Sequence, residues 1–115
     1  MIDLPLWDLV AERIVLGSVM LEDSALVEVA DILKPEHFYS GVHAIIFTTI
    51  LKVNEAQINF DVITVTEELN KRNQLEDIGG VPYVMEILEA VPPGAQTRHY
   101  AEVVHDKWIR RSRSE

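Results

Sequence analysis

The chain has 115 residues, a formal net charge of −9 at pH 7, 48% hydrophobic residues and 25% charged residues, which suits one globular domain with its own core. The sequence contains no cysteine, which excludes disulfides and thiolate metal sites, and no apolar run reaches the ~20 residues that a membrane-spanning helix needs. The first residues also lack the basic start and the small-residue cleavage site of a secretory signal, so we expect a cytoplasmic protein.

The first half of the chain predicts three helices. Apolar residues recur near the 3.6-residue period over residues 6–21. A second, shorter helix is predicted over residues 24–33, with Ser24 as its N-cap and Pro35 stopping it. The clearest helical pattern covers residues 41–55 and predicts a central helix that is buried on most sides. Its apolar stripe consists of Val42, Ile45, Ile46, Thr49, Ile50 and Val53.

Residues 61–73, DVITVTEELNKRN, combine a strand signal with a helix signal. Residues 62–66 are all β-branched, which favours a strand by propensity. Asp61, however, is a good N-cap, and the residues after the β-branched run are helical in composition. A lone strand would also lack a partner, because nothing else in the sequence alternates between apolar and polar residues. We therefore predict a helix here.

Two further helices are predicted after Gly79-Gly80, which interrupts the helical pattern. The first arm covers about residues 82–90 and the second about residues 96–111, and the Pro-Pro-Gly sequence at 92–94 forms an elbow between them. The sequence contains no internal repeat and no low-complexity segment. The predicted fold class is therefore all-α, a small bundle of about six helices with a protruding C-terminal helical hairpin.

The charge is unevenly distributed along the chain. The last nine residues, KWIRRSRSE, hold four of the ten basic side chains and one of the nineteen acidic ones, which leaves six basic and eighteen acidic groups in the rest. A body this acidic repels phosphate backbones, so we expect no direct nucleic-acid binding by it. The basic tail is interpreted either as an extended contact or linker, or as a helix end where cations interact favourably with the helix dipole.

The sequence contains few motifs that are associated with catalysis, phosphate binding or metal binding. Glu102 and His105 have the Glu-x-x-His spacing of carboxylate-bridged di-iron bundles, but the sequence contains no second such pair. Neither a G-x-S-x-G nucleophile motif nor a G-x-x-x-x-G-K-[ST] phosphate loop occurs. His43, beside the apolar stripe of its helix, is expected to be a hydrogen-bonded packing residue. We predict no catalytic residue, cofactor-binding residue or metal ligand in this chain.

The predicted hairpin has two apolar sides, and one small bundle does not readily cover both. This predicts a partner, either a second copy of the chain or another helical protein. The alternative is a hairpin that folds entirely onto its own core.

Four segments carry a resemblance to a known family. They read AERIVLGSVMLED at residues 11–23, FYSGVHAIIF at 38–47, DVITVTEEL at 61–69 with GGVPY at 79–83, and a Leu, Pro, Ala and YAEVV pattern at 88–104. In this order and spacing they resemble the N-terminal domain of DnaB-type replicative DNA helicases. The match covers nearly the whole chain, and the short motifs are specific only when taken together.

The resemblance implies an all-helical domain joined by a linker to a RecA-like ATPase domain, which would hold ATP and magnesium and drive 5′–3′ unwinding at the replication fork. Hairpins would pair between subunits, so that six domains form a trimer-of-dimers collar that receives DnaG-type primase. A helicase loader is a further implied partner. Residues 1–107 would be the collar domain and residues 108–115 the start of a linker or tail. This chain alone would then be non-catalytic.

Pattern and resemblance together give two sets of candidate residues. Tyr83, at the base of the hairpin, is the candidate primase contact, because an aromatic ring with a polar tip suits an interface; core packing is an equal alternative. The self-association candidates are apolar hairpin residues that we expect to divide between the core and a subunit contact: Val84, Ile87, Leu88, Val91, Tyr100, Val103 and Val104. Two other functions stay open, a free-standing helical adaptor without a helicase and a metal-dependent helical-bundle enzyme.

Overall fold

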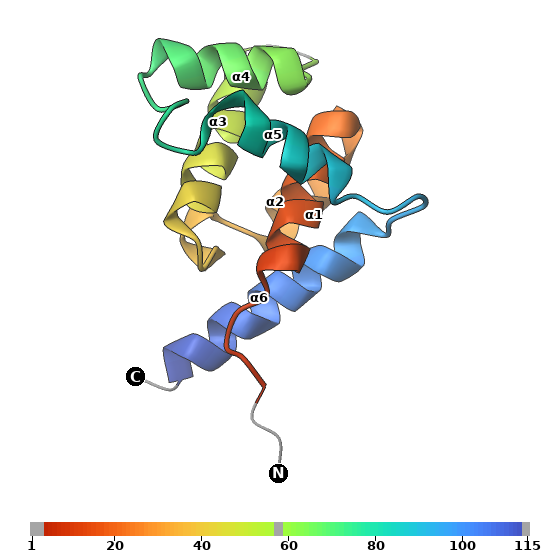
Figure 1. Ribbon diagram of the computed structural model, residues 1–115. Coiled ribbons are helices and arrows are strands. Elements are labelled where there is room, and N and C mark those ends of the chain that lie inside the picture. Colours follow the sequence, from red (N-terminus) through yellow and green to blue (C-terminus); the bar gives the residue numbers. More distant parts are fainter. Residues whose placement is uncertain (1–3, 57–58, 114–115) are drawn as a thin grey trace.

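The computed structural model describes residues 4–56 and 59–113, which contain α-helices and short 3₁₀ helices but no strand (Figure 1). The predicted all-α class with six α-helices is confirmed. None of the helices in this described part is long and apolar enough to cross a membrane. In chain order the elements are α1 (Leu9–Leu21), η1 (Asp23–Ala25), α2 (Leu26–Ile32), η2 (Pro35–His37), α3 (Gly41–Ala56), α4 (Val62–Lys71), α5 (Gly80–Glu89) and α6 (Thr97–Arg113).

Aspartate N-caps set where two helices begin. The Asp8 carboxylate accepts the backbone N–H of Ala11 at 2.9 Å, so α1 begins at Leu9, three residues later than the pattern predicts. At α4, the Asp61 carboxylate accepts the N–H of Thr64 at 3.0 Å, and the Thr64 hydroxyl accepts the N–H of Asp61 at 3.0 Å. This reciprocal capping box selects the helix over the strand that the β-branched run favours.

Helix α1 lies at the centre of the bundle and contacts α3, α4, α5 and α6. Almost every residue from Ala11 to Met20 is buried, because neighbouring helices cover α1 on nearly all sides. Helix α3, predicted to be the central helix, packs against α1, η2 and α4 and leaves part of its surface to solvent. The largest fully buried apolar side chains come from several helices and from the residue that caps α2: Leu16, Leu33, Ile46, Phe47, Ile50, Leu69 and Ile87.

The two C-terminal helices are joined by the expected elbow, but they do not form a paired, projecting hairpin. Within the described residues, α5 and α6 each pack extensively on α1 and have little contact with each other. Figure 1 shows only the connecting loop projecting to one side, while α6 runs away from α5 along the body. The reason is that each arm has one apolar stripe, and α1 is apolar enough to accept both stripes. The periodicity of the sequence identified the apolar stripes of α5 and α6, but it did not show that both stripes pack on α1.

Helix α6 continues to Arg113, so residues 108–113, predicted as the start of a linker or tail, are helical. The Arg111 guanidinium donates to the carbonyl oxygens of Leu6 at 2.8 Å and His37 at 2.9 Å, and the Lys107 ammonium donates to Pro5 O at 2.9 Å. Of the two interpretations of the basic tail, the helix end holds over this stretch, since three arginines occupy the last turn of α6. The final two residues lie outside the described part.

Candidate functional site

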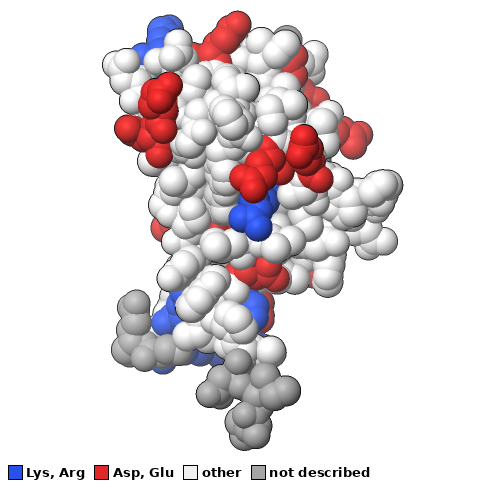
Figure 2. Space-filling view, in the orientation of Figure 1, with Lys and Arg blue, Asp and Glu red and all other residues white. Residues whose placement is uncertain are grey.

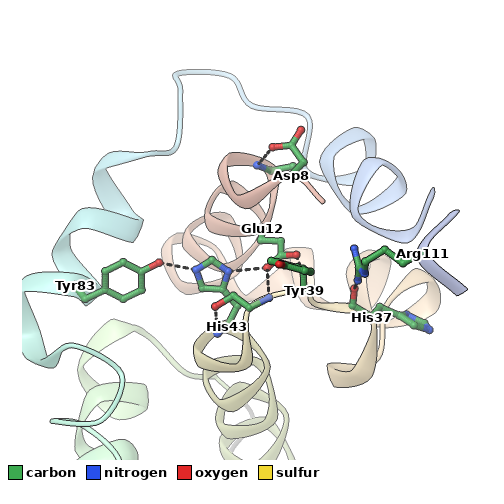
Figure 3. Close-up of polar contacts among 9 residues, drawn as sticks. Asp8, Glu12, His37, Tyr39, His43, Tyr83 and Arg111 are labelled. Carbon is green, nitrogen blue, oxygen red and sulfur yellow. Dashed lines mark hydrogen bonds and ion pairs between the residues drawn. The ribbon is translucent and has the colours of Figure 1, made fainter. Parts of the chain in front are cut away.

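A buried polar network lies where α1, η2 and α3 meet (Figure 3). The Glu12 carboxylate, 1% exposed, accepts the backbone N–H of Tyr39 at 2.8 Å and that of Ser40 at 3.3 Å. Its third partner is Nδ1 of His43, at 2.7 Å, on a side chain that is also 1% exposed. A buried carboxylate is tolerated only when hydrogen bonds replace its lost water. The loop before α3 supplies two of these bonds, and α3 itself supplies the third.

The other nitrogen of His43 extends the network to α5. Its Nε2 lies 2.6 Å from the hydroxyl oxygen of Tyr83, and the two rings stack with centroids 5.9 Å apart and an interplanar angle of 9°. With Nδ1–H donating to Glu12, Nε2 is an acceptor, so the Tyr83 hydroxyl donates to it. The prediction that His43 is a hydrogen-bonded packing residue is confirmed. Tyr83, the candidate primase contact, is half-buried with its hydroxyl turned inward.

The residue types of this network resemble those of a catalytic relay, but their burial points to a structural role. Glu12 and His43 have no access to a substrate, since their side chains are enclosed by α1, α3 and α5. The network therefore holds three helices in register. No group of three or more histidine, aspartate or glutamate side chains in the described ranges is placed to hold a metal ion. In the Glu-x-x-His pair, Glu102 accepts from Arg98 Nε at 3.1 Å, and the ring of His105 packs against His37.

The seven self-association candidates divide into two groups. Val84, Ile87 and Val104 are buried in the core, so they cannot contact a partner in this conformation. The other four are half-buried and retain surface: Leu88, Val91, Tyr100 and Val103.

An aromatic and cationic cluster attaches the second half of α6 to the N-terminal segment. Trp7 stacks on Tyr39 with centroids 4.7 Å apart, and the guanidinium carbon of Arg111 lies 5.3 Å from the Tyr39 ring centroid. The His37 ring packs against His105 at 5.0 Å and against Trp108 at 4.4 Å. Burial lowers the pKa of His37 below its ordinary value, and the neighbouring His105 lowers it further.

An open, mostly apolar groove of about 450 Å³ runs between α4 and α5, and we refer to it as the α4–α5 groove. Helix α4 lines it with Val62, Ile63, Thr66, Glu67 and Asn70. Helix α5 lines it with Val81, Val84 and Met85, and Leu75 lies between the two helices.

Sequence reasoning missed both Glu12 and the groove. A signal for Glu12 was present, because it is an acidic residue inside the otherwise apolar stretch that α1 buries. Glu12, His43 and Tyr83 also belong to three of the four segments that carry the family resemblance, although they are far apart in sequence. The groove had no comparable signal, since it depends on how α5 is placed beside α4.

Comparison with known proteins agrees with the fold. Residues 5–106 match the family model described as the DnaB-like helicase N terminal domain. The chain is 45% identical over 101 residues to the replicative DNA helicase DnaB of Geobacillus stearothermophilus, covering 88% of this chain and 22% of that protein. It is 36% identical over 108 residues to the replicative DNA helicase DnaC of Bacillus subtilis, covering 94% and 24%. The chain thus spans about a quarter of the length of these relatives.

Two solved structures share this architecture. The N-terminal domain of DnaB helicase from Mycobacterium tuberculosis superposes with a TM-score of 0.88 at 35% identity, covering 94% of this chain and 77% of that one. The N-terminal domain of DnaB helicase from Helicobacter pylori, described together with its interactions with primase, gives a TM-score of 0.76 at 25% identity, covering 91% and 81%. On both sequence and fold, this chain belongs to the family of DnaB-like helicase N-terminal domains.

Proposed function

We propose that this chain is the collar domain of a hexameric, ATP-dependent replicative helicase, and that it serves self-association and primase docking. The observation that carries the proposal is the match to the DnaB-like family over residues 5–106, together with the shared fold. The Helicobacter pylori relative, described with its interactions with primase, supports the part of the proposal that concerns primase docking. In this proposal the whole protein unwinds DNA in the 5′–3′ direction at the replication fork, in the cytoplasm.

ATP and magnesium chemistry belongs outside this chain in the same proposal. The sequence has no glycine-rich phosphate loop to cradle a triphosphate. The described residues also contain no cluster of three acidic or histidine side chains that would suit a metal ion. The proposal therefore places ATP–Mg binding in another part of the helicase and gives this chain a non-catalytic role.

The surface available for self-association is smaller than the sequence alone indicates. Three of the seven candidates belong to the core, which leaves Leu88 and Val91 on the α5 side and Tyr100 and Val103 on α6. Each of these side chains is half-buried, so a partner would cover the part that is still exposed to solvent. Burying the rest of a few apolar side chains is consistent with a weak dimer rather than a permanent one, because association also costs translational and rotational freedom.

The docking half is tested by titrating the chain with the primase of the same organism and following complex formation by light scattering. We expect a saturable complex. A primase that shows no binding at high concentration would overturn primase docking by this domain, while leaving its self-association to be judged separately.

A Tyr83→Leu variant asks whether the tyrosine ring takes part in docking. If it does, primase affinity falls while far-ultraviolet circular dichroism stays unchanged. A Tyr83→Phe variant is the matched control, because it removes only the inward hydroxyl and should leave primase affinity unaltered. Unchanged affinity in both variants would assign Tyr83 to core packing alone.

A further inference from the structure

The α4–α5 groove brings three exposed apolar side chains together on one face of the molecule. Ile63, Val81 and Met85 are 62%, 50% and 47% exposed, and all three line this one groove. Below them, Val84 is buried and forms part of an apolar floor. Contiguous apolar surface with a polar edge is typical of an interaction site, whereas single exposed apolar residues need no explanation.

The polar groups of the groove do little to reduce this apolar character. The Thr66 hydroxyl already donates to Val62 O at 2.7 Å within α4. Glu67 and Asn70 are exposed polar residues of the lining, and neither Lys nor Arg lines the groove. A binding partner would therefore gain mainly from apolar burial, with an acidic side chain beside it.

The charge around the groove is negative. Besides Glu67, exposed acidic residues are found after α4 at Glu76 and Asp77 and on α5 at Glu86. Figure 2 shows uncharged side chains over α4 and α5, with several acidic side chains and, at the upper left, a basic group around them. The basic residues nearest in sequence are Lys71 and Arg72 at the end of α4. Arg72 is paired with Glu68, Nε to Oε2 at 2.7 Å, and Lys71 is exposed, so acidic residues still outnumber basic ones around the groove.

We propose that the α4–α5 groove docks an amphipathic helix with basic flanks, contributed by a different protein. A groove between two helices suits a third helix, whose apolar residues at i, i+3, i+4 and i+7 would meet the groove. Met85, unbranched and flexible, adapts to the side chains that enter. Lysine and arginine on the flanks of the guest helix would face the acidic edge, which adds specificity and speeds association.

The charge pattern argues against other occupants of the groove. A second copy docking through the same face would bring acidic edges against each other, and like charges in an interface are unfavourable. Helix α6 ends on the side of the molecule opposite α4 (Figure 1), so its own C-terminal turn lies away from the groove. The inference goes beyond the proposed function, because it assigns a surface and a partner chemistry without requiring primase or a collar.

The test uses two synthetic peptides of about 15 residues, a length near the limit for an isolated helix. Both carry leucine at i, i+3, i+4 and i+7; one has lysine on the flanks and the other glutamate. Binding to the chain is measured by fluorescence anisotropy, and NMR chemical-shift changes locate the contact. We expect the lysine peptide to bind with shifts concentrated on α4 and α5, and the glutamate peptide to bind at least about tenfold more weakly.

Variants separate groove binding from general attraction to an acidic protein. Ile63→Ser with Met85→Ser changes only exposed apolar side chains, so the fold should be retained and affinity should fall about tenfold or more. Val27→Ser, at a 73% exposed position on α2, is the matched control and should leave affinity unchanged. Equal binding to the wild type and the double variant, shifts located elsewhere, or no binding of the lysine peptide would each overturn the proposal. Neither peptide contains primase, so these outcomes are independent of the docking experiment above.

Discussion

The Glu12 carboxylate lies 2.7 Å from Nδ1 of His43, across two helices and 31 positions of sequence, and both side chains are 1% exposed. Through the far nitrogen of His43 the contact reaches Tyr83 on α5. Three helices that carry separate sequence motifs are therefore held by one chain of hydrogen bonds. In a low-dielectric interior such a network stabilises the fold only while every member keeps its partner.

Removing the carboxylate should be costly. In a Glu12→Ala variant the N–H groups of Tyr39 and Ser40 and the ring of His43 lose their acceptor, so we expect a loss of about 3–5 kcal/mol in the free energy of unfolding. Glu12→Gln keeps the shape and one acceptor oxygen, and should lose about 1–3 kcal/mol. Urea denaturation followed by circular dichroism measures both values.

Glu55→Ala, on the exposed end of α3, is the control for these variants, and we expect a change within about 0.5 kcal/mol. A Glu12→Ala variant as stable as this control would show that the buried network contributes nothing to stability.

The Tyr83 hydroxyl contributes to the same network separately from the tyrosine ring. Tyr83→Phe preserves stacking on His43 but leaves Nε2 without its donor, so we expect a loss of about 1–3 kcal/mol. In the background of His43→Leu the same change should cost much less, because the acceptor is already absent. A double-mutant cycle by urea denaturation measures the coupling, and a coupling energy of zero would contradict the hydrogen bond.

Gly17 allows α5 to approach α1 closely. A Cβ atom at this position would lie 2.6 Å from Ile87 O and 2.6 Å from Val91 Cγ2, and the carbonyl oxygen belongs to backbone that cannot turn aside. Gly17→Ala should therefore push α5 outward and cost about 1–3 kcal/mol by thermal or urea unfolding. At Gly41 a Cβ would meet nothing within 4 Å, so Gly41→Ala should be neutral or slightly stabilising. Equal stability of the two variants would contradict this packing.

The lowered pKa of His37 predicts a pH dependence of stability. Burial is the main cause, with His105, Lys34 and Arg111 also lowering the pKa and Glu36 raising it. Because the folded pKa lies below the ordinary value of 6.5, the unfolded chain binds the proton more readily. Above pH 6.5 the neutral His37 ring makes its full contribution to the free energy of unfolding. This contribution is lost progressively as the pH falls from 6.5 to the pKa of His37 in the folded protein.

Two measurements test this pH dependence. NMR titration of the His37 ring should give a pKa below 6.5. Replacing the nearby imidazole in His105→Gln should raise the His37 pKa and reduce the stability lost between neutral and mildly acidic pH. His99→Gln, on the exposed side of α6, should leave that loss unchanged. A His37 pKa at or above 6.5 would contradict the burial of a neutral ring.

Local chemistry allowed the six helices to be predicted from sequence, and long-range contacts explain what was missed. The Asp61 cap and the Pro-Pro-Gly elbow act within a few residues, so their effects are visible in a short window. The packing of α5 on α1, rather than on α6, depends on close approach at Gly17, which the apolar stripe of α5 does not reveal.

In the candidate site, too, features set by local sequence were predicted and features set by long-range contacts were not. The apolar residues of α5 and α6 were identified, but their division between core and surface depends on which side faces α1. Periodicity does not distinguish buried Val104 from half-buried Val103 on adjacent positions of α6. Glu12 was missed because its partners come from α3 and the loop before it, and the helical pattern of α1 carries no information about them.

Self-association is the central claim, and sedimentation equilibrium of the chain over a wide concentration range tests it most directly. We expect a mass that rises with concentration toward that of a dimer, or of a species built from dimers. Leu88→Glu, at a half-buried position on α5, should reduce the association and leave the circular dichroism spectrum unchanged. A strict monomer at every concentration would contradict a collar joint formed by this chain.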